Sequence, residues 1–258
     1  MILQADYHTH TIFSHGKGSI LDNALAAKEK GLKEVAITDH GIGHRAFGVK
    51  EKELPLMRKL CDEATALTGV KVLLGIEANV LGVSGATDFP YKSAQYLDVF
   101  LAGIHKFIKY DKLAEWFKLL AANSVTKKFK DKPSAALVKR NTEIYLNAIK
   151  NNPIDVLVHP NYCIFADIKQ VAECCRDYGT YFEIDARKEH LTDEEWKTVI
   201  DTGVSFVIDS DAHKKTDVGN INGAKEMLSR LDFPLDRIVN LNGVLPENTR
   251  FSEFKKKL

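Results

Sequence analysis

Seven short apolar runs constrain the fold of this chain most strongly. Each is short enough to form one buried strand, and in order they are MILQADYH, EVAITDH, KVLLGIEAN, LDVFLAGIH, IDVLVHP, TYFEIDAR and VSFVIDSDAH. Helical stretches lie between most of them, one placed between Ser19 and Gly31 and another ending at Gly179. Because apolar runs that alternate with amphipathic helices are typical of a parallel sheet covered on both faces, we predict one α/β domain, a closed or nearly closed seven-stranded barrel of the TIM type.

The charge and cysteine content exclude several classes of protein. Lys and Arg number 36 against 35 Asp and Glu, so no global charge favours nucleic acid or an anionic membrane surface. The four cysteines form no CxxC pair, which fits neither a disulfide framework nor a thiolate zinc site. The N-terminus lacks the pattern of a signal peptide, and no stretch approaches about 20 apolar residues. We therefore expect a cytoplasmic protein without a membrane anchor.

Ionisable residues gather at the ends of the predicted strands. In a parallel barrel the loops that follow the strands converge on one face, where active sites lie. His8 and His10 are two positions apart, as are Asp211 and His213, so each pair points the same way. The residues expected at this face are His8, His10, His15, His40, Glu77, His105, His159, Asp211 and His213.

This set of side chains predicts a metal centre. Seven imidazoles crowded into one funnel would repel each other if protonated, whereas imidazole nitrogens and carboxylates are ligands of Zn²⁺, Mn²⁺ and Fe. Nine ligands exceed what one ion needs, so we expect two or three divalent transition-metal ions. Glu77 is the natural bridge between ions because a carboxylate can share its two oxygens.

The motifs DYHTH, ITDHG, GIEAN, AGIH, VHP and DSDAH resemble those of the polymerase and histidinol phosphatase (PHP) superfamily, over residues 4 to 215. The resemblance implies a distorted (β/α)7 barrel with a trinuclear site, and hence one PHP-type metallohydrolase domain over residues 1–258. It also implies three ligand sets: His8, His10, Glu77 and Asp211; then Glu77, His105 and His159; then His15, His40 and His213. Because no ligand is missing, the resemblance favours an active member of the family.

Clustered divalent ions turn a bridging water into a hydroxide nucleophile near neutral pH and polarise a bound ester. We therefore expect a metal-dependent phosphatase that acts on a small phosphate monoester, with Glu77 and Asp211 in the catalytic machinery. Histidinol phosphate is one substrate of the family. Two alternatives remain open: a phosphodiesterase or exonuclease acting on nucleic acid, and a non-enzymatic, metal-stabilised regulatory module. Amidohydrolase chemistry is disfavoured because no predicted strand ends in the lysine that many such enzymes carboxylate.

Three further residues are candidates for contact with the substrate. Arg187 follows the sixth strand, which supplies no ligand, so its guanidinium could clamp two phosphate oxygens or simply begin a surface loop. Lys106 follows His105 and either contacts phosphate or is solvated. His190 could protonate the leaving group or lie in a solvated loop.

Three residues beside the predicted ligands have supporting or unrelated roles. Asp39, which precedes His40, either orients a ligand imidazole or closes the local loop. Asp6 shares a face with His8 and is expected to support the ligands without binding metal. His44 is expected in a solvated loop.

A basic insert covers residues 106–140, with ten Lys and Arg against three Asp and Glu. It follows the fourth strand and so rises from the catalytic end. It is either a solvated face or a mobile basic lid that attracts an anionic substrate. Trp116 and Phe117 are expected to pack the lid down rather than to stack on a base.

Overall fold

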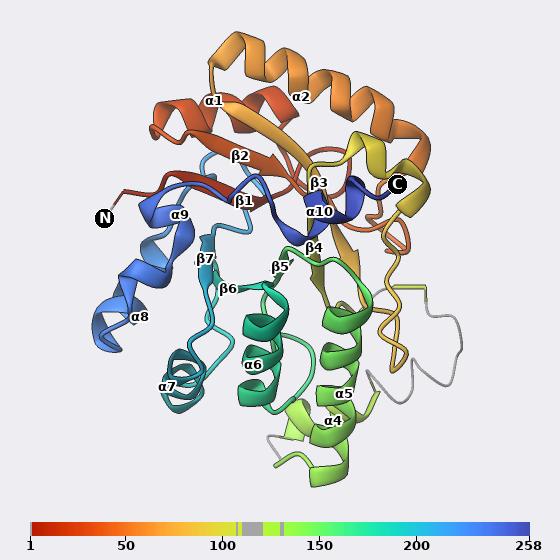
Figure 1. Ribbon diagram of the computed structural model, residues 1–258, viewed down its shortest axis with the longest axis vertical. Coiled ribbons are helices and arrows are strands. Elements are labelled where there is room, and N and C mark those ends of the chain that lie inside the picture. The colour runs from red at the N-terminus through yellow and green to blue at the C-terminus, as the bar shows by residue number, and fades with distance from the viewer. Residues whose placement is uncertain (1, 107, 110–120, 130–131) are drawn as a thin grey trace.

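The seven predicted strands form a single parallel sheet. The computed structural model describes residues 2–106, 108–109, 121–129 and 132–258 (Figure 1). The strand order follows the sequence from β1 to β7, and every neighbouring pair is parallel. The strands are β1 Ala5–Thr9, β2 Glu34–Ile37, β3 Lys71–Asn79, β4 Val99–Gly103, β5 Val156–Leu157, β6 Tyr181–Asp185 and β7 Phe206–Asp209. The predicted fold class is confirmed.

Helices cover the outside of the sheet. Figure 1 shows α1 beside α2 on one side of the sheet and α5 beside α6 on the opposite side. The helices are α1 Ile20–Glu29, α2 Leu54–Thr68, α4 Ala122–Phe129, α5 Ala135–Asn151, α6 Ile168–Tyr178, α7 Asp193–Asp201, α8 Asn222–Arg230, α9 Val239–Asn242 and α10 Arg250–Lys255, with short turns η1 Glu51–Glu53, η2 Tyr91–Tyr96 and η4 Leu235–Arg237. Ser19 caps α1 in a reciprocal capping box with Asp22, and Gly179 ends α6 in the left-handed conformation, as the sequence predicts.

Two apolar layers hold the barrel together. The larger layer lies between the strands and the helices and includes Val35, Leu74 and Phe100. The smaller layer fills the barrel interior near the amino ends of the strands and consists of Ala5, Tyr7, Ala36, Val99, Leu101, Val156, Val158, Val207 and Leu245. Because side chains alternate along a strand, the next inward positions of β3 after Leu73 are Gly75, Glu77 and Asn79. The polar site therefore lies directly above an apolar plug.

The barrel is nearly closed where the segment after β7 meets the end of β1. The amide of His10 donates to the carbonyl of Ala212 at 2.8 Å, and the amide of Tyr7 donates to Oδ1 of Asp209 at 2.7 Å. Lower down, the side chain of Asn240 from α9 fills the gap between the two strands. Its Oδ1 accepts from the amide of Ile208 at 2.9 Å, and its Nδ2 donates to the carbonyls of Ala5 and Ile208 at 2.9 and 2.7 Å.

The predicted insert is described only in part. Within residues 106–140 the structure describes α4 and the first turns of α5. Trp116 and Phe117 lie outside the described residues, so the basic lid stays a prediction. In the part of the chain that the structure describes, no helix has the length and apolar character needed to cross a membrane.

Asn240→Ala should weaken the closure of the barrel. The change leaves the buried amide of Ile208 and two buried carbonyls without their partner, so the free energy of unfolding should fall by about 2–4 kcal/mol. The matched control is Asn242→Ala on the same short helix, whose amide donates to Leu235 and Ile238 at a more exposed position and should lose about 1 kcal/mol or less. Urea denaturation measures both variants, and equal losses would mean that Asn240 does not join the two strands.

Candidate metal centre

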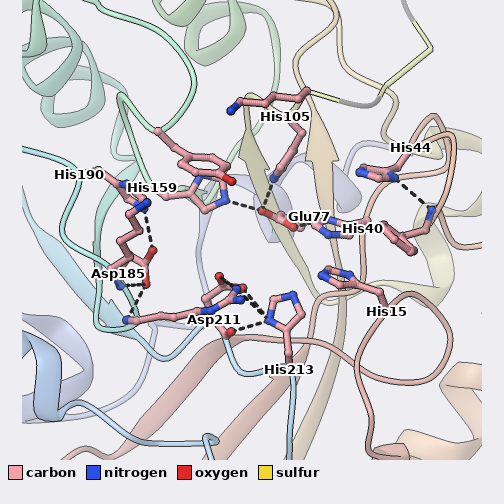
Figure 2. A pocket seen from close by; sticks show the side chains of 15 residues that line it. His15, His40, His44, Glu77, His105, His159, Asp185, His190, Asp211 and His213 are labelled. Carbon is pink, nitrogen blue, oxygen red and sulfur yellow. Dashed lines mark hydrogen bonds and ion pairs between the residues drawn. The ribbon is translucent and has the colours of Figure 1, made fainter. Parts of the chain in front are cut away.

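The nine predicted ligands meet at one end of the barrel. Seven of them line a single cavity of about 450 Å³ at the carboxyl ends of the strands (Figure 2): His15, His40, Glu77, His105, His159, Asp211 and His213. His8 and His10 are completely or almost completely buried and pack against this group from below. The structure thus brings together every ligand position that the sequence singled out.

Glu77 is the centre of the arrangement. Its carboxylate is fully buried, and Oε1 lies 2.8 Å from Nε2 of His105 and 2.7 Å from Nε2 of His159. The same oxygen lies 3.4 Å from Nε2 of His8, while Oε2 lies 2.6 Å from Nδ1 of His40. One carboxylate therefore faces imidazoles that come from four different strand ends.

Asp211 forms a second, smaller centre beside the first. Its Oδ1 lies 3.1 Å from Nε2 of His10 and 3.6 Å from Nε2 of His8. The ring of His213 lies 4.5 Å from that of His10 and 4.1 Å from that of His15, measured between centroids. The cluster of imidazole rings therefore extends from the barrel interior to the loops.

Four groups of side chains place their ligand atoms within 4.8 Å of one another: His10, His15, His40 and His213; His8, His10 and Asp211; His8, Glu77 and His159; and His40, Glu77 and His105. The grouping differs in detail from the three sets that the family resemblance implies. His105 and His159 both contact Glu77 but fall into separate groups, and His10 joins the outer histidines. The assignment of ligands to individual ions therefore stays a prediction.

Attraction between Glu77 and the histidines around it lowers the pKa of the carboxyl group and raises that of His159. Burial would raise the pKa of Glu77, but His105, His40 and His8 outweigh it and hold that pKa well below the ordinary value. Burial likewise opposes the charge on His159, but the hydrogen bond and the charge of Glu77 raise its pKa to about 9. A buried carboxylate that stays ionised is a strong ligand for a cation.

The outer histidines are held neutral. Burial, reinforced by His213 and His10, lowers the pKa of His15 to about 3. Burial and His10 lower the pKa of His213 to about 4. Burial also lowers the pKa of His40 well below its ordinary value. Neutral imidazole is the form that binds metal, so these rings are prepared as ligands at neutral pH.

Two buried side chains that the sequence analysis missed orient the ligand rings. Glu183 on β6 lies 2.6 Å from Nδ1 of His8, and its other carboxylate oxygen accepts the amide of His159. Oδ1 of Asn79 lies 2.7 Å from Nδ1 of His105. In both rings Nε2 is left facing Glu77, as in many metal sites where a ligand histidine is fixed through its other nitrogen. The sequence could have indicated both residues. Glu183 lies two positions before Asp185 and Asn79 two positions after Glu77, so both side chains would be expected to face the barrel interior.

The backbone at the site is strained. His159 has φ 30° and Asp211 has φ 45°, in the left-handed region that side chains rarely adopt. Each such residue costs about 1–3 kcal/mol, and such costs concentrate at functional sites. Gly103 is also required here, because a Cβ at that position would lie 2.8 Å from the ring of His159. The positions of His159 and Asp211 at the cavity are therefore reached at a cost in local stability.

The residues beside the ligands divide clearly by role. Asp39 accepts from the amide and hydroxyl of Thr11 and from the hydroxyl of Ser14, so it closes the first loop. Its Oδ1 also lies 3.9 Å from Nδ1 of the ligand candidate His10, which is beyond hydrogen-bond distance. Asp6 accepts from Ser210 and Gly219, so it supports the junction of β1 with the segment that follows β7.

The expectation that His44 is solvated is wrong. Its ring is buried, lines the cavity and stacks on His40 with centroids 4.8 Å apart. The amide of Phe47 donates to Nδ1 of His44 at 3.1 Å, which folds this loop back over the site.

The three residues predicted to contact substrate all line the cavity. Nη1 of Arg187 lies 2.6 Å from Oδ2 of Asp211 and 3.1 Å from Nδ1 of His213, and 54% of the arginine side chain is exposed. Nε2 of His190 lies 3.0 Å from Oδ2 of Asp185, so this ring is held in place and is not a solvated loop residue. Lys106 is exposed at the rim, with Nζ 5.9 Å from the ring centroid of Tyr162.

The comparison with known families agrees with this geometry. The PHP domain matches residues 6–188, which contain seven of the nine predicted ligands. This chain belongs to the PHP domain family. The resemblance seen in the sequence motifs is therefore confirmed.

Relatives of this PHP domain protein match along nearly their whole length. A probable phosphatase of Caldanaerobacter subterraneus subsp. tengcongensis is 31% identical over 254 residues, covering 92% of this chain and 87% of that protein. A probable phosphatase of Vibrio parahaemolyticus is 30% identical, covering 93% and 90%. Among solved structures, histidinol phosphate phosphatase of Lactococcus lactis, complexed with zinc, L-histidinol and phosphate, has a TM-score of 0.59 at 13% identity, covering 90% of this chain and 95% of that chain. At this identity the likeness supports the fold alone.

Glu77→Gln should loosen more than one metal ion at once. The change removes the negative charge that faces five imidazoles, so metal bound per chain should fall by at least one ion, measured by elemental analysis after growth with Mn²⁺ or Zn²⁺. Glu34→Gln is the matched control, because Glu34 is another buried glutamate but lies at the amino end of β2 and contacts Tyr7 and Lys71. Unchanged metal content in the Glu77 variant would remove Glu77 from the centre of the site.

Proposed function

We propose that this protein is a metal-dependent phosphatase that releases phosphate from a small phosphate monoester. The observation that carries the proposal is the ring of imidazoles around Glu77 and Asp211 at the mouth of a barrel. Membership of the PHP domain family and the names of the curated relatives bear out the expectation of a hydrolase acting on phosphoric ester bonds. The number of ions, their identity and the substrate belong to the proposal.

The residues present fit a multinuclear metal site. Buried polar atoms of five predicted ligands have no hydrogen-bond partner among the described residues: Nδ1 of His10, His15, His40 and His159, and Oε2 of Glu77. Nδ1 of His40 and Oε2 of Glu77 lie only 2.6 Å apart without hydrogen-bond geometry. Such orphaned polar atoms are costly in a protein interior, and coordination to a cation would satisfy them.

Two or three divalent ions would be held by the nine ligands described above. When bound, such ions lower the pKa of a coordinated water and polarise the oxygens of the ester. A dianionic phosphate benefits most from several adjacent cations, which is why a phosphate monoester is the proposed substrate.

The remaining lining residues act on the substrate directly. Arg187 carries an exposed guanidinium beside Asp211, where it can donate to two phosphate oxygens. Lys106 adds a second cation at the rim. His190, fixed by Asp185, supplies the proton that the leaving oxygen takes up. Figure 2 shows His190 and Asp185 on one side of the cavity and His15 and His44 on the other.

Hydrolysis of para-nitrophenyl phosphate should require metal. We expect activity to disappear after exhaustive chelation and to return when Mn²⁺ or Zn²⁺ is added, because the nucleophile depends on the ions. Turnover is followed by the absorbance of nitrophenolate. A panel that adds a dinucleotide and single-stranded DNA tests the alternative of a phosphodiesterase. Activity that survives complete removal of metal would refute the proposed chemistry.

Arg187→Ala should weaken phosphate handling while the metals stay bound. Loss of one charge-assisted clamp costs about 1.5–3 kcal/mol, so kcat/KM should fall roughly tenfold to a hundredfold. Arg176→Ala is the control, because this exposed arginine pairs with Asp177 at the end of α6 and does not line the cavity. The kinetics are measured beside metal content. Unaltered kinetics would make Arg187 a surface residue, and loss of metal would make it a support for Asp211.

A further inference from the structure

We propose that the leaving group of the substrate carries a second anionic group and no amine, a preference set by the charges around the cavity. This inference rests on the proposed phosphatase function and adds the chemical class of the substrate. It concerns the part of the substrate that extends from the metals toward the rim, where Lys106 and Lys188 lie.

Every acidic side chain among the described lining residues is already engaged. Glu77 and Asp211 face the histidines, and Asp211 also accepts from Arg187. Asp185 is the remaining one, and it is almost completely buried. Its Oδ1 accepts from the amides of Arg187 and Lys188 at 2.8 and 3.3 Å, and its Oδ2 lies 3.0 Å from Nε2 of His190. No carboxylate of the described cavity is therefore left to pair with an ammonium group on a substrate.

Two cations, by contrast, lie at the rim without a carboxylate partner among the described residues. The side chains of Lys106 and Lys188 are exposed and line the same cavity as Arg187. Lys106 lies against Tyr162, whose ring centroid is 5.4 Å from that of His159, so this lysine stands next to the ligand group. Lys188 follows Arg187 in the segment that Asp185 fixes through two backbone amides.

The positive charges at the rim favour some leaving groups over others according to the charge of the leaving group. A substrate that holds its phosphate at the metals and Arg187 extends its other end toward the rim, where Lys106 and Lys188 lie. A carboxylate or second phosphate there gains attraction, whereas an ammonium group meets like charges. The preference is a difference in affinity between similar molecules, so a series of matched substrates measures it.

Three phosphate esters of nearly equal size form that series: phosphoglycolate with a carboxylate, hydroxyethyl phosphate with a neutral hydroxyl, and phosphoethanolamine with an ammonium. We expect kcat/KM to decrease in that order, with about a hundredfold between the first and the last. Non-hydrolysable analogues separate binding from chemistry. Phosphonopropionate should bind at least tenfold more tightly than aminopropylphosphonate, measured by isothermal titration calorimetry.

Variants locate the source of the preference. The double variant Lys106→Gln with Lys188→Gln removes two partly exposed ion pairs between these lysines and the carboxylate of the substrate. The ratio of kcat/KM for phosphoglycolate to that for hydroxyethyl phosphate should therefore fall about tenfold. The control is Lys59→Gln on α2, whose side chain is 71% exposed on the outer helical layer. Its ratio should equal that of the unmodified protein.

The outcomes separate this inference from the function beneath it. Failure to hydrolyse any of the three esters or para-nitrophenyl phosphate would refute the proposed function. Hydrolysis with equal or reversed preference, most clearly a preference for phosphoethanolamine, would leave the function intact and overturn the inference. A preference for phosphoglycolate that the double variant retains would also overturn it, because these two lysines would then not create it.

Discussion

The attraction between one buried carboxylate and the imidazoles around it determines the rest of this structure. Glu77 has no exposed surface, and an isolated carboxylate in such a place would be expelled or protonated. It stays ionised because His8, His40, His105 and His159 approach it from four strand ends. Only a parallel barrel brings the carboxyl ends of so many strands to one point, so the fold and the site depend on the same geometry.

The barrel tolerates this buried polar cluster because the layers below it are well packed and joined by hydrogen bonds. An apolar plug fills the interior beneath the ligands, and Asn240 joins β1 to β7 where the ring of strands would otherwise open. Strain is then concentrated at His159 and Asp211, each in the left-handed region and each a predicted ligand. Glu183 binds both the ring of His8 and the amide of His159, so one buried side chain supports two neighbouring parts of the site.

The sequence predicted the strands and the meeting of nine candidate ligands at the barrel mouth, because both follow local rules. Apolar runs mark buried strands, and the residue that ends each run must lie at the barrel mouth. The roles of Glu183, Asn79 and His44 could not be predicted, since they depend on which rings approach from other strands and on how a loop folds back. His44 illustrates this. Nothing near it in the sequence indicates that the amide of Phe47 donates to its ring, or that this ring stacks on His40.

The most direct test of this account is the anomalous X-ray diffraction of crystals of the purified, metal-loaded protein, recorded at the absorption edges of Zn, Mn and Fe. Two or three peaks are expected among the nine ligands, with the carboxylate of Glu77 within about 2–2.2 Å of two of them. The account would be contradicted by a carboxylate that contacts only the imidazoles of His105 and His159 while any metal lies elsewhere.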